Sequence, residues 1–172
     1  EVLRTPHLSM GPRIDDFEAA LAEFVGAKEA IGVSSGTAGL HLCVRAAGIQ
    51  PGDLVLTTPF SFVASTNAIL FEGGIPVYVD VDPKTGNMDP LLAAQALEDL
   101  RKGGAAARRW LPRKGAGDTA RLKALLPVDV FGQPADYDLL QPLAEEFHLK
   151  HIEDSCESLG AEYKSRRLGL MG

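Results

Sequence analysis

Short apolar runs alternate with amphipathic stretches along this chain, and the alternation constrains the fold more than any other feature. The strand candidates span residues 30–33, 54–57, 76–81, 125–131 and 149–153. Apolar residues recur at helical spacing in residues 15–25, 37–47, 62–71, 89–100 and 137–147. Parallel strands need crossover connections of this kind, and the helices then cover both faces of the sheet. The sequence therefore predicts an α/β protein, a three-layer α/β/α fold with a mostly parallel sheet.

A turn of small residues separates the first strand candidate from the helix that follows it. Gly36, Thr37 and Ala38 stand where this helix begins. A helix N-terminus binds phosphate well, because its N–H groups are unpaired and its dipole favours negative charge. Asp154 ends the last strand candidate, and Phe62 lies in an aromatic segment between the two. A phosphate cradle, a flat ring and a buried acid together indicate a planar phosphorylated cofactor with a ring nitrogen.

Composition narrows the class of protein. The chain has 172 residues, of which 45% are hydrophobic, and no apolar run approaches the roughly twenty residues needed to cross a bilayer. Its net charge of -6 argues against a nucleic-acid partner, which would need a surplus of Lys and Arg. Cys43 and Cys156 form no disulfide framework. We expect one domain, a cytoplasmic location, and neither membrane nor nucleic acid as a partner.

Residues 101–120 form a basic, Gly-rich insertion that interrupts the rhythm of strands and helices. Connections of this length are usually functional or disordered. The simpler interpretation is a solvated, mobile insertion. The alternative is an arginine-rich flap that reaches the phosphates of a substrate, with Trp110 as a stacking or packing anchor.

Five blocks, taken in order, resemble one known family. They are residues 36–38, 60–65, 76–82, 127–136, and 152–154 followed by 160–164. Together they resemble the DegT/DnrJ/EryC1/StrS aminotransferases, which are pyridoxal 5'-phosphate (PLP) enzymes of the aspartate-aminotransferase fold, fold type I. Most members aminate keto groups on nucleotide-linked sugars. The resemblance covers nearly the whole chain apart from the basic insertion.

The resemblance implies a role for each candidate cofactor-binding residue. Thr37 and Ala38, beside Gly36, would bind the phosphate, and Phe62 would stack on the pyridine ring. Asp154 would pair with the pyridinium nitrogen and keep it protonated. Glu157 stands where the family commonly has Gln or His beside the phenolic oxygen of the cofactor. A carboxylate there would repel a phenolate unless one of the two holds a proton.

The resemblance also implies that the chain is incomplete. The family's Schiff-base lysine lies beyond the block at residues 164–169, so we expect it beyond Gly172 and assign no catalytic residue within the chain. Residues 1–172 would then be a partial PLP-binding large domain, without its C-terminal part and without the small domain. Such a chain should not turn over by itself, because the lysine both holds the cofactor and moves protons.

The resulting functional hypothesis is an aminotransferase. At full length it would transfer an amino group from an amino acid such as glutamate to a nucleotide-linked keto sugar, and it would act as a homodimer. The alternatives are a non-catalytic PLP-binding fragment or module, and a same-family sugar dehydratase that uses pyridoxamine phosphate (PMP). A remote alternative is an α/β hydrolase whose nucleophile is Ser34, in the G-x-S-x-G pattern of residues 32–36. Asp80 and Asp82 are interpreted as turn residues, and no metal site is expected.

Overall fold

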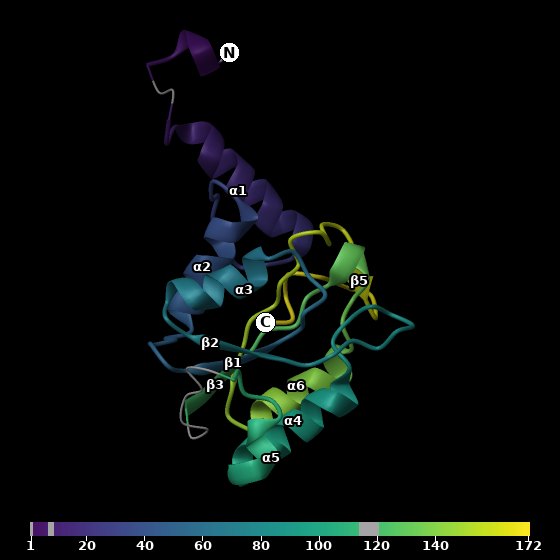
Figure 1. The fold of residues 1–172 in the computed structure, drawn as a ribbon. Coiled ribbons are helices and arrows are strands. Elements are labelled where there is room, and N and C mark those ends of the chain that lie inside the picture. The colour runs from purple at the N-terminus through teal and green to yellow at the C-terminus, as the bar shows by residue number, and fades with distance from the viewer. Residues whose placement is uncertain (1, 7–8, 114–120) are drawn as a thin grey trace.

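The centre of the fold is a parallel sheet (Figure 1). The computed structural model describes residues 2–6, 9–113 and 121–172. Strands β1 (Leu54–Thr57), β2 (Ile75–Tyr78), β3 (Leu122–Leu125) and β4 (Lys150–His151) lie in the order β2-β1-β3-β4. Each neighbouring pair is parallel. The predicted parallel sheet is confirmed.

Helices cover both faces of this sheet. On one side lie α2 (Gly36–Ala46) and α3 (Ala64–Phe71), with α1 (Pro12–Val25) beyond them (Figure 1). On the other side lie α4 (Pro90–Lys102), α5 (Gly104–Arg108) and α6 (Tyr137–Glu146). A hairpin of β5 (Glu162–Tyr163) and β6 (Arg166–Arg167) and short 3₁₀ turns at Val2–Arg4 and Val130–Gly132 complete the description. The three-layer architecture is confirmed, and no helix of the described ranges is long and apolar enough to cross a membrane.

Two separate hydrophobic cores follow from the alternation of side chains along the strands. Leu54 and Leu56 of β1 pack into the core formed with α4 and α6. Val55, between them, packs into the other core, with Leu40 of α2 and Ala68 of α3. All three β1 side chains are fully buried. Because β1 is packed on both faces, its position is well defined. The segment that follows its carboxyl end, which carries pocket residues, is therefore well positioned too.

Two strand predictions need correction. Residues 30–33 form no strand, because no described strand pairs with them, and Ile31 and Val33 are exposed. Apolar character does not make a strand without a neighbour that supplies hydrogen bonds. The strand predicted at 125–131 is Leu122–Leu125 instead. Val128 keeps only an isolated bridge to Asp154, and the chain then turns into the 3₁₀ segment.

The described part of the basic insertion is ordered and packed. It contains the end of α4 and all of α5, and residues 114–120 lie outside the described residues. Trp110 packs against the core, and its Nε1–H donates to Asp99 at 3.0 Å. The Arg109 guanidinium lies 4.7 Å from the Trp110 ring and pairs with Asp99 at 3.3 Å. Trp110 is therefore a packing anchor for the helical part of the insertion, in which most of the other described side chains are exposed.

Candidate active site

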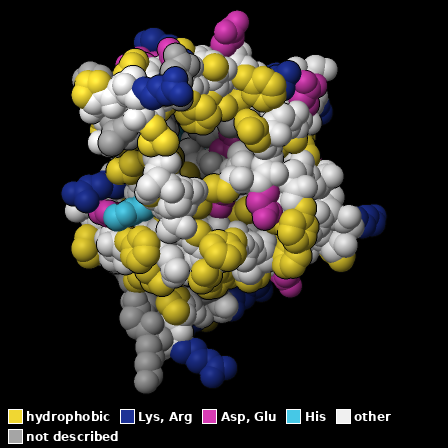
Figure 2. Space-filling model, turned by 90° about the horizontal axis from the view of Figure 1, so that it is seen from above, with side chains coloured by type: hydrophobic (Ala, Val, Ile, Leu, Met, Phe, Trp, Pro, Cys, Tyr) yellow, Lys and Arg dark blue, Asp and Glu magenta, His cyan; other side chains and the backbone are white. Residues whose placement is uncertain are grey.

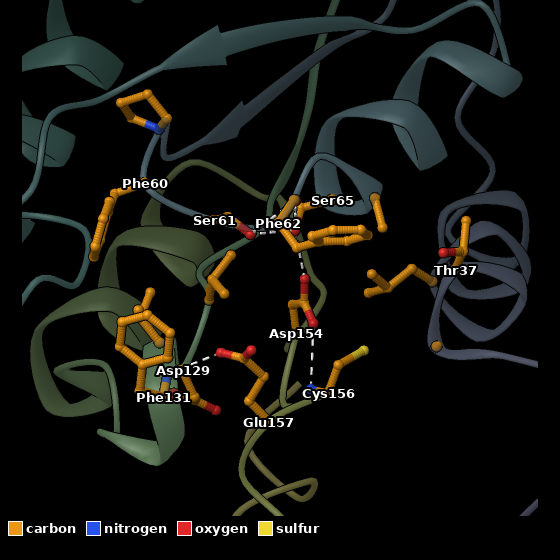
Figure 3. A pocket seen from close by; sticks show the side chains of 16 residues that line it. Thr37, Phe60, Ser61, Phe62, Ser65, Asp129, Phe131, Asp154, Cys156 and Glu157 are labelled. Carbon is orange, nitrogen blue, oxygen red and sulfur yellow. Dashed lines mark hydrogen bonds between the residues drawn. The ribbon is translucent and has the colours of Figure 1, made fainter.

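A pocket of about 460 Å³ lies at the carboxyl end of the sheet. Four segments form it: the start of α2 and the chain that follows β1, β3 and β4. Sixteen residues line it (Figure 3): Gly36, Thr37, Leu40, Pro59, Phe60, Ser61, Phe62, Ala64, Ser65, Val128, Asp129, Val130, Phe131, Asp154, Cys156 and Glu157. Segments far apart in the sequence therefore meet where parallel sheets usually bind ligands.

Asp154 is the buried acid of this pocket, with only 4% of its surface exposed. One carboxylate oxygen, Oδ2, accepts a hydrogen bond from the Ser65 hydroxyl at 2.6 Å. The other, Oδ1, accepts from the backbone N–H of Cys156 at 3.3 Å. A carboxylate can accept about four hydrogen bonds, so Asp154 keeps acceptor capacity for a ligand. Figure 3 shows the carboxylate within the pocket.

The N-terminus of α2 forms the side of the pocket away from Phe60 and Phe131 (Figure 3). Gly36 and Thr37 line the pocket, whereas Ala38 does not. The Ala38 N–H donates to the N-cap side chain, Ser35 Oγ, at 3.1 Å. The first N–H groups of a helix have no intrahelical acceptor, so those of Gly36 and Thr37 are the ones that can meet an anion.

Gly36 lies in close contact with Cys156 at this helix terminus. A Cβ atom at Gly36 would lie 2.9 Å from the sulfur of Cys156. Burial raises the pKa of Cys156 to about 12, and its hydrogen bond to Asp154 and the charge of that carboxylate add to the effect. The thiol therefore stays protonated and packs against the helix, in agreement with a structural role rather than that of a nucleophile.

Aromatic side chains form the remaining wall. Phe62 is exposed and lines the pocket beside Ser65 (Figure 3). Phe60 and Phe131 meet edge to face, with ring centroids 6.2 Å apart. Glu157 Oε2 accepts the backbone N–H of Phe131 at 3.0 Å, and this residue has a left-handed backbone with φ of 52°. Glu157 thus fixes the strained turn that presents an aromatic ring at the pocket.

Asp129 is a second buried acid among the residues that line the pocket. Its Oδ1 accepts hydrogen bonds from the Tyr137 hydroxyl and the Ala135 N–H, both at 2.8 Å. Its Oδ2 lies 2.6 Å from the Ser155 hydroxyl. Burial raises the pKa of Asp129 above its ordinary value, although these hydrogen bonds oppose the shift. Burial, followed by the Asp129 charge, also raises the pKa of Tyr137, which keeps the phenol protonated as a donor.

No Lys, Arg or His is among the sixteen lining residues. Lys164, in the last of the five blocks, pairs with Asp138 outside the pocket. An anion here would therefore be held by N–H groups, by the Thr37 hydroxyl and by the α2 dipole. Ser34 does not line the pocket, and residues 30–33 lack the strand that a nucleophile elbow requires, which contradicts the hydrolase alternative. Within the described ranges, no cluster of His, Cys, Asp or Glu could hold a metal.

The structure thus brings five of the six predicted residues into one pocket: Gly36, Thr37, Phe62, Asp154 and Glu157. Sequence reasoning missed Ser65 and Phe131, which also line it. A signal for Ser65 existed, because it lies three residues after Phe62 and four after Ser61, a spacing that brings side chains together on one helical face. No sequence signal marks Phe131, because its left-handed backbone depends on the carboxylate of Glu157, 26 residues away.

The fold and the pocket place this protein among the fold-type I aminotransferases. A crystal structure of a DegT/DnrJ/EryC1/StrS aminotransferase from Brucella abortus superposes with a TM-score of 0.83, at 31% identity, over 98% of this chain and 41% of that one. The family model described as the DegT/DnrJ/EryC1/StrS aminotransferase family matches residues 1–172. The chain belongs to this family, whose members use PLP.

Two curated relatives illustrate the similarity. The UDP-2-acetamido-2-deoxy-3-oxo-D-glucuronate aminotransferase of Pseudomonas aeruginosa is 37% identical over 166 residues, which cover 96% of this chain and 40% of that protein. The dTDP-3-amino-3,4,6-trideoxy-alpha-D-glucose transaminase of Streptomyces venezuelae is 34% identical over 98% of this chain and 39% of that protein. The chain spans about two fifths of the length of these relatives.

Proposed function

We propose that this protein, at its full natural length, is a PLP-dependent aminotransferase that acts on a nucleotide-linked keto sugar. The observation that carries the proposal is the position of Asp154, a buried carboxylate in the same pocket as a helix N-terminus and an exposed aromatic ring. Relatives named for the amination of UDP- and dTDP-linked sugars support this substrate class. The amino donor would be an amino acid such as glutamate.

The residues present fit PLP in chemistry and in shape. Because Gly36 has no Cβ, the first turn of α2 can lie against Cys156. The N–H groups of this turn then lie at the pocket wall. Gly36 and Thr37 would hold the phosphate, while the Ala38 N–H is already engaged by Ser35. Phe62 would cover one face of the ring. When bound, PLP supplies an electron sink for the carbon that exchanges the amino group.

Asp154 would hold a proton on the ring nitrogen through its charge. An ionised carboxylate next to a basic nitrogen favours the protonated form of that nitrogen, and low solvent exposure strengthens the effect. The remaining acceptor capacity of the Asp154 carboxylate allows this contact without loss of the bonds from Ser65 and Cys156.

Glu157 would lie beside the phenolic oxygen. Its Oε2 is held by the Phe131 N–H, so its position is fixed, and the second oxygen is the group that would face the ligand. A carboxylate there tolerates a phenolic oxygen when one proton is shared between the two. Glu157 would therefore keep that proton within the pocket.

We further propose that two copies assemble. Many large apolar side chains are exposed, among them Phe17, Phe24, Ile31, Leu42 and Phe71. Figure 2 shows hydrophobic side chains gathered on one face, around a hollow that contains acidic groups. Apolar patches of this kind usually mark protein interfaces, and closed dimers are the commonest assembly.

Replacement of Asp154 by Asn tests the proposal. The two side chains are isosteric, but the amide cannot hold the ring proton by charge. We expect the transaminase rate of the full-length protein to fall on the order of a thousandfold, with little change in Tm. Electrostatic contacts in active sites that exclude water have effects of this size. If Asp154 only caps a turn, Asn serves nearly as well and activity survives. Retained activity would contradict the proposal.

A further inference from the structure

Ser61, Ser65 and Asp154 form a hydrogen-bonded row along the wall of the candidate cofactor pocket. The Ser61 and Ser65 hydroxyl oxygens are 2.6 Å apart, and Ser65 Oγ lies 2.6 Å from Asp154 Oδ2. Ser65 is 1% exposed and sits in the first turn of α3, whereas Asp154 follows β4, 89 residues later. Figure 3 shows these hydrogen bonds, which lead from Ser61 through Ser65 to the Asp154 carboxylate. The contact therefore ties two layers of the fold together at the site.

The number of available protons fixes the direction of donation along these hydrogen bonds. A hydroxyl has one proton to donate, and an ionised carboxylate can only accept. Ser65 must therefore give its proton to Asp154 when that group is charged. The proton between the two serines then comes from Ser61, whose hydroxyl also lies 3.1 Å from the Phe62 carbonyl oxygen, and the shorter contact to Ser65 aligns both hydroxyl dipoles with the carboxylate. Hydrogen-bond chains aligned in this way strengthen one another.

Ser65 supplies the strongest contact of Asp154. Within the described ranges, the other protein contacts of this carboxylate come from Cys156: the N–H donates at a long 3.3 Å, and the thiol is a weak donor. None of the lining residues carries a positive charge that could balance the carboxylate. A charged acceptor in a short hydrogen bond gains more than a neutral one. Loss of the Ser65 hydroxyl would leave Oδ2 without its protein donor and free the side chain to rotate.

We propose that Ser65 is a positioning residue that holds the Asp154 carboxylate oriented toward the ring nitrogen of the cofactor, with Ser61 as the second donor. The inference rests on the proposed PLP function and adds to it. Ser65 does not need to touch the cofactor. Its effect passes through Asp154, and it should therefore matter only for ligands that present a protonated ring nitrogen.

The test compares two ligands on the full-length apoprotein. One is PLP, and the other is its 1-deaza analogue, in which a C–H group replaces the ring nitrogen. Equilibrium titration by absorbance gives both Kd values for wild type, Ser65→Ala and Ser65→Thr. Ser158→Ala is the matched control, because this buried serine donates to the backbone carbonyl of Asp129 and does not line the pocket.

We expect Ser65→Ala to weaken PLP binding by about tenfold to a hundredfold and to change the Kd of the analogue by less than about threefold. Ser65→Thr, which keeps the hydroxyl, should restore most of the loss, and Ser158→Ala should affect both ligands equally. In an Asp154→Asn background, Ser65→Ala should add little, because the two residues act as a unit.

Two results would overturn the inference. An equal loss for both ligands in Ser65→Ala would mean that the serine only supports the shape of the pocket. Full additivity with Asp154→Asn would mean that it acts independently of the carboxylate. These failures leave the proposed function standing if wild type still prefers PLP to the analogue. If wild type binds neither ligand, the proposed function fails and the inference fails with it.

Discussion

The Ser155 hydroxyl lies between two carboxylates and has one proton to donate. Its oxygen is 2.6 Å from Asp129 Oδ2 and 2.7 Å from Glu153 Oε1. Glu153 also accepts the N–H groups of Gly169 and Met171, at 2.7 Å each, which fix its carboxylate as an acceptor beside Ser155. When Ser155 donates to Glu153, Asp129 Oδ2 faces a lone pair unless Asp129 itself carries a proton.

We therefore expect Asp129→Asn to stabilise the protein at neutral and alkaline pH. The amide oxygen can keep the bonds from Ala135 and Tyr137, and the amide NH₂ can donate to Ser155. The variant thus imitates protonated Asp129. An unsatisfied buried contact costs about 1–3 kcal/mol, so relief should be worth on the order of 1 kcal/mol, or about 2–4 °C in Tm for a domain of this size.

The stability advantage of Asp129→Asn over wild type should increase with pH. Because burial raises the pKa of Asp129 above its ordinary 3.8, the unfolded chain releases this proton first as the pH rises. Wild type then loses stability until the pH passes the raised pKa, whereas the amide does not titrate. The advantage of Asp129→Asn should therefore be near zero at acid pH and should grow to a plateau above the raised pKa.

Urea denaturation at about pH 3, below the ordinary pKa of Asp129, and at about pH 8 measures this advantage. Asp15→Asn is a control of opposite sign, because Asp15 lies in the first turn of α1, where the helix dipole favours a charged carboxylate. The reasoning is refuted if Asp129→Asn is less stable than wild type at the higher pH, or if its advantage is the same at both.

The other predictions concern packing, the missing lysine and assembly. Gly36→Ala should cost about 1–3 kcal/mol in urea denaturation, because the new Cβ meets Cys156 Sγ at 2.9 Å, and a second change, Cys156→Ala, should recover most of it; no recovery would contradict the clash. Borohydride reduction of the 172-residue chain with PLP should leave no stoichiometric pyridoxyl-lysine adduct by mass spectrometry, since no lysine lines the pocket. Sedimentation at micromolar concentration should show a dimer or larger species, and a clean monomer would count against the exposed apolar face as an interface.

Local patterns predicted most of the fold. The strand at 54–57 matches β1, and the helix at 15–25 lies within α1 and ends at Gly26, whose φ is 84°. These elements are set by periodicity and by residues that stop helices, which act over short distances. Residues 30–33 and 125–131 were predicted less well. Whether they pair depends on distant neighbours, and no window of sequence contains those.

The site shows the same division. Asp154 and Thr37 could be found because each stands directly beyond a predicted strand or turn, where parallel sheets bind ligands. The use of the Ala38 N–H by Ser35 could also have been anticipated, since Ser at an N-cap commonly bonds the N–H three residues on. The bond from Ser65 to Asp154 could not, because its partners are 89 residues apart and meet only after both hydrophobic cores have formed.

The charge arrangement of the pocket has a kinetic consequence. Asp154 and Glu157 line it, no Lys or Arg does, and the chain carries a net charge of -6. A phosphorylated ligand is therefore repelled at a distance and attracted only on contact with the first turn of α2. Salt at physiological strength screens interactions beyond about 8 Å and leaves contact hydrogen bonds largely intact. Capture of such a ligand should become faster as ionic strength rises, the reverse of the behaviour of proteins that draw anions in with a basic surface.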